Sequence, residues 1–294
     1  MLKQSVKGSA AALIANVIFG FSFLFSKIAL DVAHPLIILS VRFTVAFAVL
    51  SALWACGAVK LNLRGKPKKR LLLMALAQPL VYFITELYGI DYTSSAMSGI
   101  IISLVPVAVI VLSTVWLKET PTLPQILFSA LSLGAVVAIS LLSNDGGQNH
   151  LFGVVLLLIA VLCAAVFNIL SRGESARFTP FERTWVMFLV GTVGFNLISV
   201  IALGGNYVEE LARAVSQPLF WGSIGYLSIA SSIAAFMLYN YATTNISTVR
   251  AASFSNLITV VSVVAGVLIL RETMSLPQLI CCVLIIVGVF GVNR

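Results

Sequence analysis

The sequence predicts an all-α membrane protein in which ten transmembrane helices form two inverted five-helix repeats. The first observation is composition: 60% of the 294 residues are hydrophobic and 10% are charged, whereas roughly 25% of the residues of an average soluble domain are charged. The second is a mean hydropathy of +1.08. The third is a motif that occurs once in each half of the chain. This composition excludes a water-soluble globular domain, because too much of its surface would be apolar.

Ten apolar segments are bounded by charges, prolines and polar turns. Because the hydrocarbon core of a bilayer is about 30 Å thick, a spanning helix needs roughly 20 apolar residues. Two polar stretches stand out between the segments: a basic loop at 60–70, and 204–217, which carries Glu209 and Glu210. The predicted spans are 8–29, 35–57, 71–90, 94–117, 123–142, 151–171, 181–203, 218–240, 246–270 and 276–292.

Basic residues between the apolar segments predict the orientation of the chain. With a cytoplasmic N-terminus, Arg213 and Arg271 fall outside, and Lys27 and Arg42 fall within spans. All other lysines and arginines, Arg183 among them, fall on the cytoplasmic side, as the positive-inside rule requires. We therefore expect a multi-pass protein of the cell inner membrane, surrounded by lipid, with both termini in the cytoplasm. The net charge of +8 follows from this distribution and implies no nucleic-acid partner.

An internal repeat relates the two halves of the chain. Residues 118–125 recur as residues 271–278, with five of eight positions identical. Each half contains five predicted spans, and because this number is odd, the second copy is inverted relative to the first. The predicted repeats are residues 1–142, with helices one to five, and residues 151–294, with helices six to ten, in one membrane domain.

The repeated motif places a carboxylate and a proline between two spans. Glu119 and Glu272 follow a basic residue at the end of a span, and Pro124 and Pro277 open the next helix. Proline is suited to the first turn of a helix, and a carboxylate is stabilised near a helix N-terminus. We expect these four residues to hold the fourth and ninth spans in tight hairpins with the fifth and tenth.

Several further motifs accompany the repeated hairpin. They are Arg42-Phe43, Tyr92-Thr93-Ser94-Ser95-Ala96, Pro106, Gln125, Gly134, Gln278 and Gly288. Together with the hairpins, they make nearly the whole chain resemble the EamA branch of the drug/metabolite transporter superfamily. The resemblance implies two five-helix repeats, with spans one, three, four, six, eight and nine around a central cavity. The second half departs from the pattern of the first, with Thr259 in place of Pro106 and Met187 in place of Arg42.

Three charged residues in the first three predicted spans, Lys27, Arg42 and Glu86, lie in the outer third of the membrane. Each costs about 2.5–3.5 kcal/mol to insert unless it has a partner, a wet cavity or an escape to the interface. Lys27 either snorkels to the headgroups or faces a cavity. Arg42 is expected to make a structural ion pair or hydrogen bonds. Glu86 is either a proton-coupling site or a static partner of Lys27 or Arg42, because the protonation of a buried carboxylate depends on its neighbours.

Polar residues at helical spacing indicate which helix faces line a cavity, because residues three, four or seven apart share a face. The alternative is that these side chains join helices by hydrogen bonds. The predicted substrate-cavity residues are Asn16, Phe23, Lys27, Gln78, Tyr82, Glu86, Asn168, Tyr239 and Asn256.

The leading functional prediction is a secondary transporter that exports a small metabolite, such as an amino acid or a similar amphipathic solute, by alternating access. The proton is a candidate coupling ion. The alternatives are an intramembrane enzyme acting on a lipid or peptide, and a membrane scaffold or sensor. Enzyme chemistry is not expected, because His34 and His150 fall in outer loops and no nucleophile or metal-binding motif occurs. No metal, cofactor or ATP-binding loop is expected.

Overall fold

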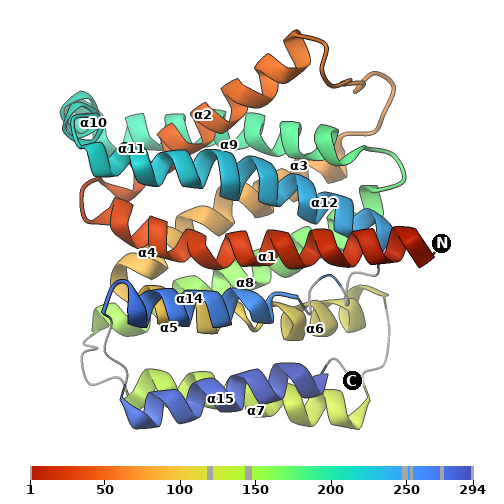
Figure 1. Cartoon of the computed structure of the whole chain (residues 1–294), viewed down its shortest axis with the longest axis vertical. Helices are drawn as coiled ribbons and strands as arrows, with labels where there is room; N and C mark the ends of the chain where they lie inside the picture. The colour runs from red at the N-terminus through yellow and green to blue at the C-terminus, as the bar shows by residue number, and fades with distance from the viewer. Residues whose placement is uncertain are drawn as a thin grey trace.

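The structure is a computed structural model that describes residues 2–117, 122–142, 148–246, 251, 254–271 and 275–292. All regular elements of this part of the chain are helices, which confirms the all-α class (Figure 1). The elements are α1 (Leu2–Leu30), α2 (Pro35–Ala55), α3 (Lys69–Ala75), η1 (Leu76–Val81), α4 (Tyr82–Tyr92), α5 (Ser95–Ile102), α6 (Val105–Leu117), α7 (Leu123–Leu142), α8 (Gln148–Glu174), α9 (Pro180–Leu203), η2 (Gly204–Asn206), α10 (Tyr207–Val215), α11 (Pro218–Gly225), η3 (Tyr226–Ala235), α12 (Phe236–Asn245), α14 (Asn256–Leu268) and α15 (Leu276–Val292).

Among the residues that the structure describes, seven helical stretches are long and apolar enough to cross a membrane, so the chain is a multi-pass membrane protein. Two shorter apolar helices, Leu257–Leu268 and Leu279–Gly288, follow them in the C-terminal part of the described chain. The seven stretches are Gln4–Leu30, Pro35–Ala55, Lys69–Tyr92, Ser95–Leu112, Leu151–Glu174, Pro180–Val215 and Pro218–Asn245.

Three of the predicted spans are interrupted in the described structure. In the predicted span 246–270, a turn at 254–255 precedes α14, and the other two breaks lie close to a proline. In the predicted span 71–90, Gln78 leaves helical geometry with φ −145° and ψ 116°, and Pro79 follows inside the π-helix η1. In the predicted span 94–117, a turn at 103–104 separates α5 from α6. Proline cannot donate a helical hydrogen bond and restricts the residue before it. Pro79 and Pro106 therefore explain why the helical ladder breaks in these two places.

The polar stretch 204–217 contains a helix. Gly204, with φ +52°, ends α9, and α10 follows on the surface with Arg213 paired to Glu209 and Glu210. Positive φ is accessible to glycine at little cost, which allows the chain to turn sharply there. Apolar residues three or four positions apart give α10 one face for the protein, and the charged residues between them face water.

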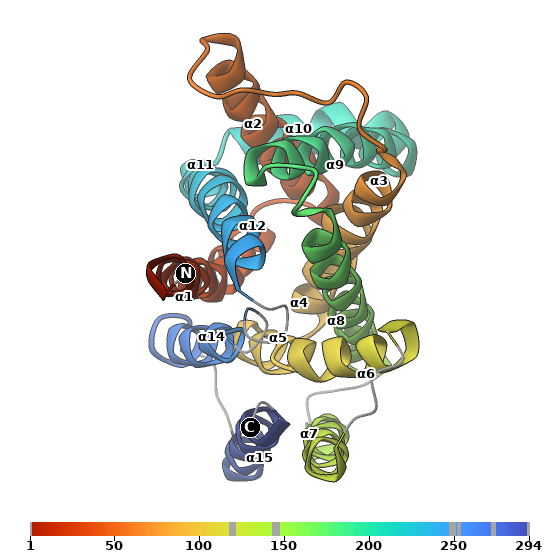
Figure 2. The ribbon, with the colours of Figure 1, turned by 90° about the vertical axis from the view of Figure 1, so that its right-hand side faces the viewer.

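The helices pack around α1 and α8. Helix α1 contacts α14, α12 and η3, whereas α8 contacts α4, α6 and α3; α2 packs against α9. Helices α7 and α15 contact each other and form a pair at one end of the molecule, set apart from the remaining helices (Figure 2). The central space therefore lies between the α1 side and the α4/α8 side of the molecule.

A glycine allows α5 and α14 to approach closely. A Cβ atom added at Gly99 would collide with the side chain of Ser262, and the Thr259 hydroxyl donates a hydrogen bond to the Gly99 carbonyl at 3.0 Å. Small residues at helix contacts in membranes permit backbone approach of this kind.

We predict that Gly99→Ala destabilises the folded protein by about 1–3 kcal/mol, because the added methyl group overpacks this contact. The measurement is thermal unfolding of the purified protein. Adding Ser262→Gly to this variant removes the colliding side chain and restores the melting temperature. Gly222→Ala is the matched control, because nothing lies within 4 Å of a Cβ there. Equal melting temperatures for Gly99→Ala and the unchanged protein would contradict the close contact.

Candidate functional site

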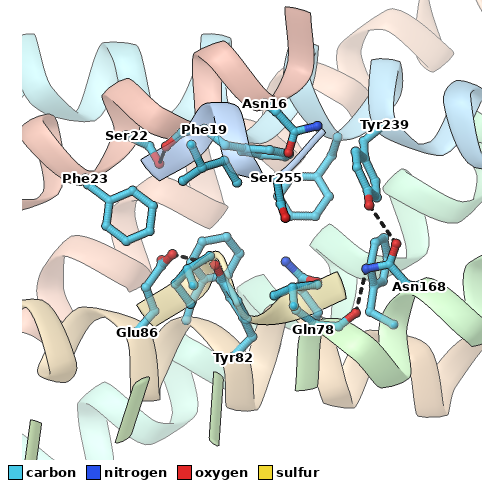
Figure 3. A pocket seen from close by; sticks show the side chains of 17 residues that line it. Asn16, Phe19, Ser22, Phe23, Gln78, Tyr82, Glu86, Asn168, Tyr239 and Ser255 are labelled. Carbon is cyan, nitrogen blue, oxygen red and sulfur yellow. Dashed lines mark hydrogen bonds between the residues drawn. The ribbon is translucent and has the colours of Figure 1, made fainter. Parts of the chain in front are cut away.

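A cavity of about 60 Å³ lies in the centre of the helices, with room for several water molecules. Its lining comes from α1, η1 with α4, the α5–α6 junction, α8, α12, and residues 255 and 258 at the start of α14. These are the six segments that the family resemblance implies. Figure 3 shows α1 side chains on one wall facing η1 and α4 side chains on the other.

Most of the predicted cavity residues meet at this cavity. Lys27 is absent from its lining, and the side chain of Asn256 lies outside the described residues. The predicted residues that line it are Asn16, Phe23, Gln78, Tyr82, Glu86, Asn168 and Tyr239.

The cavity also contains residues that helical polarity did not identify. Phe236 lies three residues before Tyr239 on the same helix, so helical spacing from Tyr239 identifies it. Ser22 and Ser255 carry no periodic signal. Other lining residues absent from the prediction are Phe83, Ile102, Val105, Ala164, Phe167 and Ile258.

One end of the cavity is formed by the interrupted third segment. The break at Gln78 ends one helical run, and Tyr82 and Glu86 then follow one and two turns later on the same face of α4. The Tyr82 hydroxyl donates a hydrogen bond of 2.6 Å to Glu86 Oε1. Glu86 is 4% exposed and makes no ion pair in the described part of the chain. The choice between a proton-coupling site and a static partner of Lys27 or Arg42 therefore stays a prediction.

The other end of the cavity is formed by the Asn168 amide, which is hydrogen-bonded to the Tyr239 hydroxyl. Tyr239 donates a hydrogen bond of 2.6 Å from its hydroxyl to Asn168 Oδ1, and Asn168 Nδ2 donates to the Ala164 carbonyl at 2.8 Å. Phe167 stacks on Tyr239, with 6.3 Å between ring centroids. These contacts fix both polar side chains at the boundary between α8 and α12.

Lys27 and Arg42 both lie outside the cavity lining. The Lys27 ammonium is half-buried and donates to the Ile90 carbonyl at 3.5 Å. Arg42 is 1% exposed, and its guanidinium donates to Ser232 Oγ at 2.9 Å and Ser231 Oγ at 3.2 Å. It also lies 4.3 Å from the centroid of the Phe83 ring, a favourable cation–π arrangement. Of the two roles predicted for Arg42, the structure therefore shows the hydrogen-bonded one.

Arg183, one of the arginines predicted on the cytoplasmic side, is buried in the protein. It is 0% exposed. Its guanidinium donates to the Ser171 carbonyl and hydroxyl, both at 2.7 Å, and to the Asn240 carbonyl and Thr244 Oγ1, both at 2.6 Å. The sequence did not predict this burial, because Arg183 lies at the start of a span, where an exposed and a buried arginine give the same sequence pattern.

Glu182, the residue before Arg183, joins the basic loop to α9. It forms a capping box with Thr179 at the helix N-terminus, and its carboxylate pairs with Lys66 Nζ at 2.7 Å. The backbone N–H of Asn62 also donates to this carboxylate at 3.0 Å. The predicted basic loop, residues 60–70, therefore contacts the N-terminus of α9.

The hairpin motifs are described in part. Glu119 and Glu272 lie outside the described residues. Pro124 and Pro277 are each the second residue of a helix, α7 and α15 respectively, where the missing N–H of proline is tolerated.

An all-helical, multi-pass membrane fold with a polar and aromatic cavity among its helices is typical of membrane proteins that bind a small solute, transporters among them. A model of the EamA-like transporter family matches residues 6–141 and, a second time, residues 151–294. The chain belongs to the EamA-like transporter family.

Similar proteins agree with this membership. The uncharacterized transporter YcxC of Bacillus subtilis (strain 168) is 35% identical over 292 residues, which cover 99% of this chain and 94% of that protein. An uncharacterized transporter of Archaeoglobus fulgidus is 24% identical, over 94% of this chain and 95% of its own length. A solved structure titled "Crystal structure of protein" superposes with a TM-score of 0.71 and 15% identity, over 97% of this chain and 96% of that one. The family and the names of these relatives point to transport rather than to enzyme activity.

Proposed function

We propose that the protein is a secondary transporter of the cell inner membrane that moves a small amphipathic solute, such as an amino acid, by alternating access. In this proposal, ten transmembrane helices form two inverted repeats, residues 1–142 and 151–294, and both termini are cytoplasmic. The direction is export. The two separate matches of the family model, one for each half, support the repeat.

The composition of the cavity wall carries this proposal. Asn16, Tyr82 and Glu86 come from the first half of the chain, whereas Asn168 and Tyr239 come from the second. In a transporter built from two related halves, the solute site lies at the interface between them, and movement of one half against the other opens it to alternate sides. A scaffold or sensor has no need of such a cavity.

Glu86 is the proposed proton-coupling group. It is the only charged side chain among the described lining residues, and its hydrogen bond from Tyr82 keeps it at the cavity wall. A buried carboxylate that loses and regains a proton as the cavity changes sides couples solute movement to a proton gradient.

The test is transport by the purified full-length chain in sealed proteoliposomes, supplied with a broad panel of small metabolites. We expect at least one solute to cross faster than in protein-free vesicles, and an imposed pH gradient to drive its accumulation. A ligand from the same panel is expected to raise the melting temperature, because binding to the folded state stabilises it by mass action. A panel in which no solute moves or stabilises the protein would contradict the proposed function.

A further inference from the structure

The lining of the cavity carries a single charged side chain in the part of the chain that the structure describes. This side chain is that of Glu86. The Lys27 ammonium is directed at the Ile90 carbonyl, and the Arg42 guanidinium is engaged by two serine hydroxyls and the Phe83 ring. Among the lining residues that the structure describes, a solute carboxylate therefore meets no cation, whereas a solute ammonium meets a carboxylate.

The Glu86 carboxylate retains binding capacity. In the described part of the chain its hydrogen-bond donor is Tyr82, which binds Oε1 at 2.6 Å, and no protein donor occupies Oε2. Figure 3 shows this carboxylate at the cavity wall, with Phe23 on the opposite side. An ammonium group has three donors and no acceptor. It therefore complements the unused oxygen, and a charge-assisted hydrogen bond of this kind is stronger than a neutral one.

The remaining wall favours a cation with an apolar body. Five phenylalanines and two tyrosines are among the lining residues. Aromatic faces attract cations through their quadrupole, and this attraction is stronger in a desolvated site. The same rings provide apolar contact for an aromatic or aliphatic body, so both parts of an organic ammonium ion are accommodated.

Gln78 and Ser255 add neutral polar groups to the cavity wall. The Gln78 side chain lines the cavity eight residues before Glu86 on the same segment, on the order of 10 Å along the helix axis. Ser255 Oγ is buried in the wall without a hydrogen-bond partner in the described structure. An amide and a hydroxyl recognise neutral polar groups such as a phenol, an alcohol or an amide, and neither supplies a positive charge for a carboxylate.

We propose that this cavity recognises a small organic ammonium ion through Glu86, with the apolar body of the ligand against the aromatic wall and any neutral polar group toward Gln78 and Ser255. The inference rests on the proposed transport function and narrows its solute class: an amine is preferred over the amino acid with the same body. The protein recognises the ammonium group of the ligand, whereas the carboxylate of an amino acid lowers the affinity because it finds no positively charged partner among the described lining residues.

The experiment compares three compounds that share one aromatic body: phenethylamine, phenylalanine and 3-phenylpropionate. Each is tested on the full-length protein for its effect on melting temperature and for uptake or exchange in proteoliposomes. Phenethylamine is expected to bind with roughly tenfold higher affinity than phenylalanine, the effect of one unmatched charged group. We expect 3-phenylpropionate to have no effect.

Two variants assign the effect to the carboxylate. Glu86→Gln is expected to lower the affinity for phenethylamine at least about tenfold, whereas Glu86→Asp, which keeps the charge, retains most of the preference. Glu209→Gln is the matched control, because it makes the same chemical change on α10, where the side chain is 72% exposed. It is expected to bind phenethylamine like the unchanged protein.

The outcomes separate this inference from the proposed function. Transport of phenylalanine or phenylpropionate in preference to phenethylamine would overturn the ammonium assignment and leave the transporter intact. An undiminished amine preference in Glu86→Gln would also overturn it. Failure of every compound in the broad metabolite panel would instead count against transport itself.

Discussion

Replacing Glu86 with glutamine is expected to abolish accumulation driven by a pH gradient while exchange at saturating solute concentration continues. Glutamine keeps the size of the side chain and can still accept the hydrogen bond from Tyr82, but it cannot take up or release a proton. A transporter without its coupling group moves solute down its own gradient and no longer responds to protons. The measurement is solute flux in proteoliposomes with and without an imposed pH gradient.

Two controls accompany this prediction. Glu209→Gln changes an exposed carboxylate on α10 and is expected to leave gradient-driven transport unchanged. The melting temperature of Glu86→Gln shows whether the variant is folded. If gradient-driven accumulation in Glu86→Gln equals that of the unchanged protein, Glu86 has a structural role and another group carries the proton.

Replacing Arg183 with methionine is expected to produce the largest loss of stability. Methionine fills a similar volume but removes the hydrogen bonds that the guanidinium donates to Ser171, Asn240 and Thr244 in a buried site. A hydrogen bond to a charged group contributes about 1.5–3 kcal/mol, so we expect a total loss of about 3 kcal/mol or more. Thermal unfolding of the purified protein provides the measurement.

The shape of the guanidinium makes a sharper version of this test possible. Arg183 uses two terminal nitrogens to reach α8 and α12 at once, whereas a lysine ammonium is a single point. Arg183→Lys is therefore expected to recover only part of the lost stability. Arg213→Met, at a position 58% exposed on α10, is the control and is expected to change stability by less than about 1 kcal/mol. An Arg183→Met protein as stable as the control would show that the buried guanidinium does not hold these helices together.

The two buried arginines connect different helices to one continuous segment. Arg42 on α2 binds Ser231 and Ser232 in η3, and Arg183 on α9 binds Asn240 and the following turn of α12. The cavity residues Phe236 and Tyr239 lie between these two attachments. Each arginine therefore fixes one end of the segment that forms this wall of the cavity.

Sequence periodicity predicted much of the site because the stripe residues of α1 and α4 are spaced by whole helical turns. Asn16 and Phe23 line the cavity from α1, and Tyr82 and Glu86 line it from α4. Periodicity failed for Lys27, which shares the stripe but reaches the Ile90 carbonyl instead. A long, flexible side chain allows the charged end to leave the face from which the residue starts.

Arg183 shows a different limit of sequence reasoning. A basic residue at the end of an apolar run satisfies the positive-inside rule whether it faces water or the interior. Its burial depends on acceptors on two other helices, Ser171 on α8 and Asn240 on α12, which are 12 and 57 residues away in the sequence. Only helix packing brings these acceptors together around one guanidinium.

The sequence by itself determined that this chain lies in a membrane, is helical and belongs with the EamA-like transporters, because composition, span length and repeated motifs are local properties that need no coordinates. The tertiary structure decided which charges face the cavity. Of the three charged residues in the first three predicted spans, only Glu86 lines the described cavity, whereas Lys27 and Arg42 lie outside it. The physical reason is that a charge in a low-dielectric interior is stabilised by whichever polar groups packing brings within reach. The sequence thus offered three charged candidates for the cavity, and helix packing places only one of them, Glu86, in the described lining.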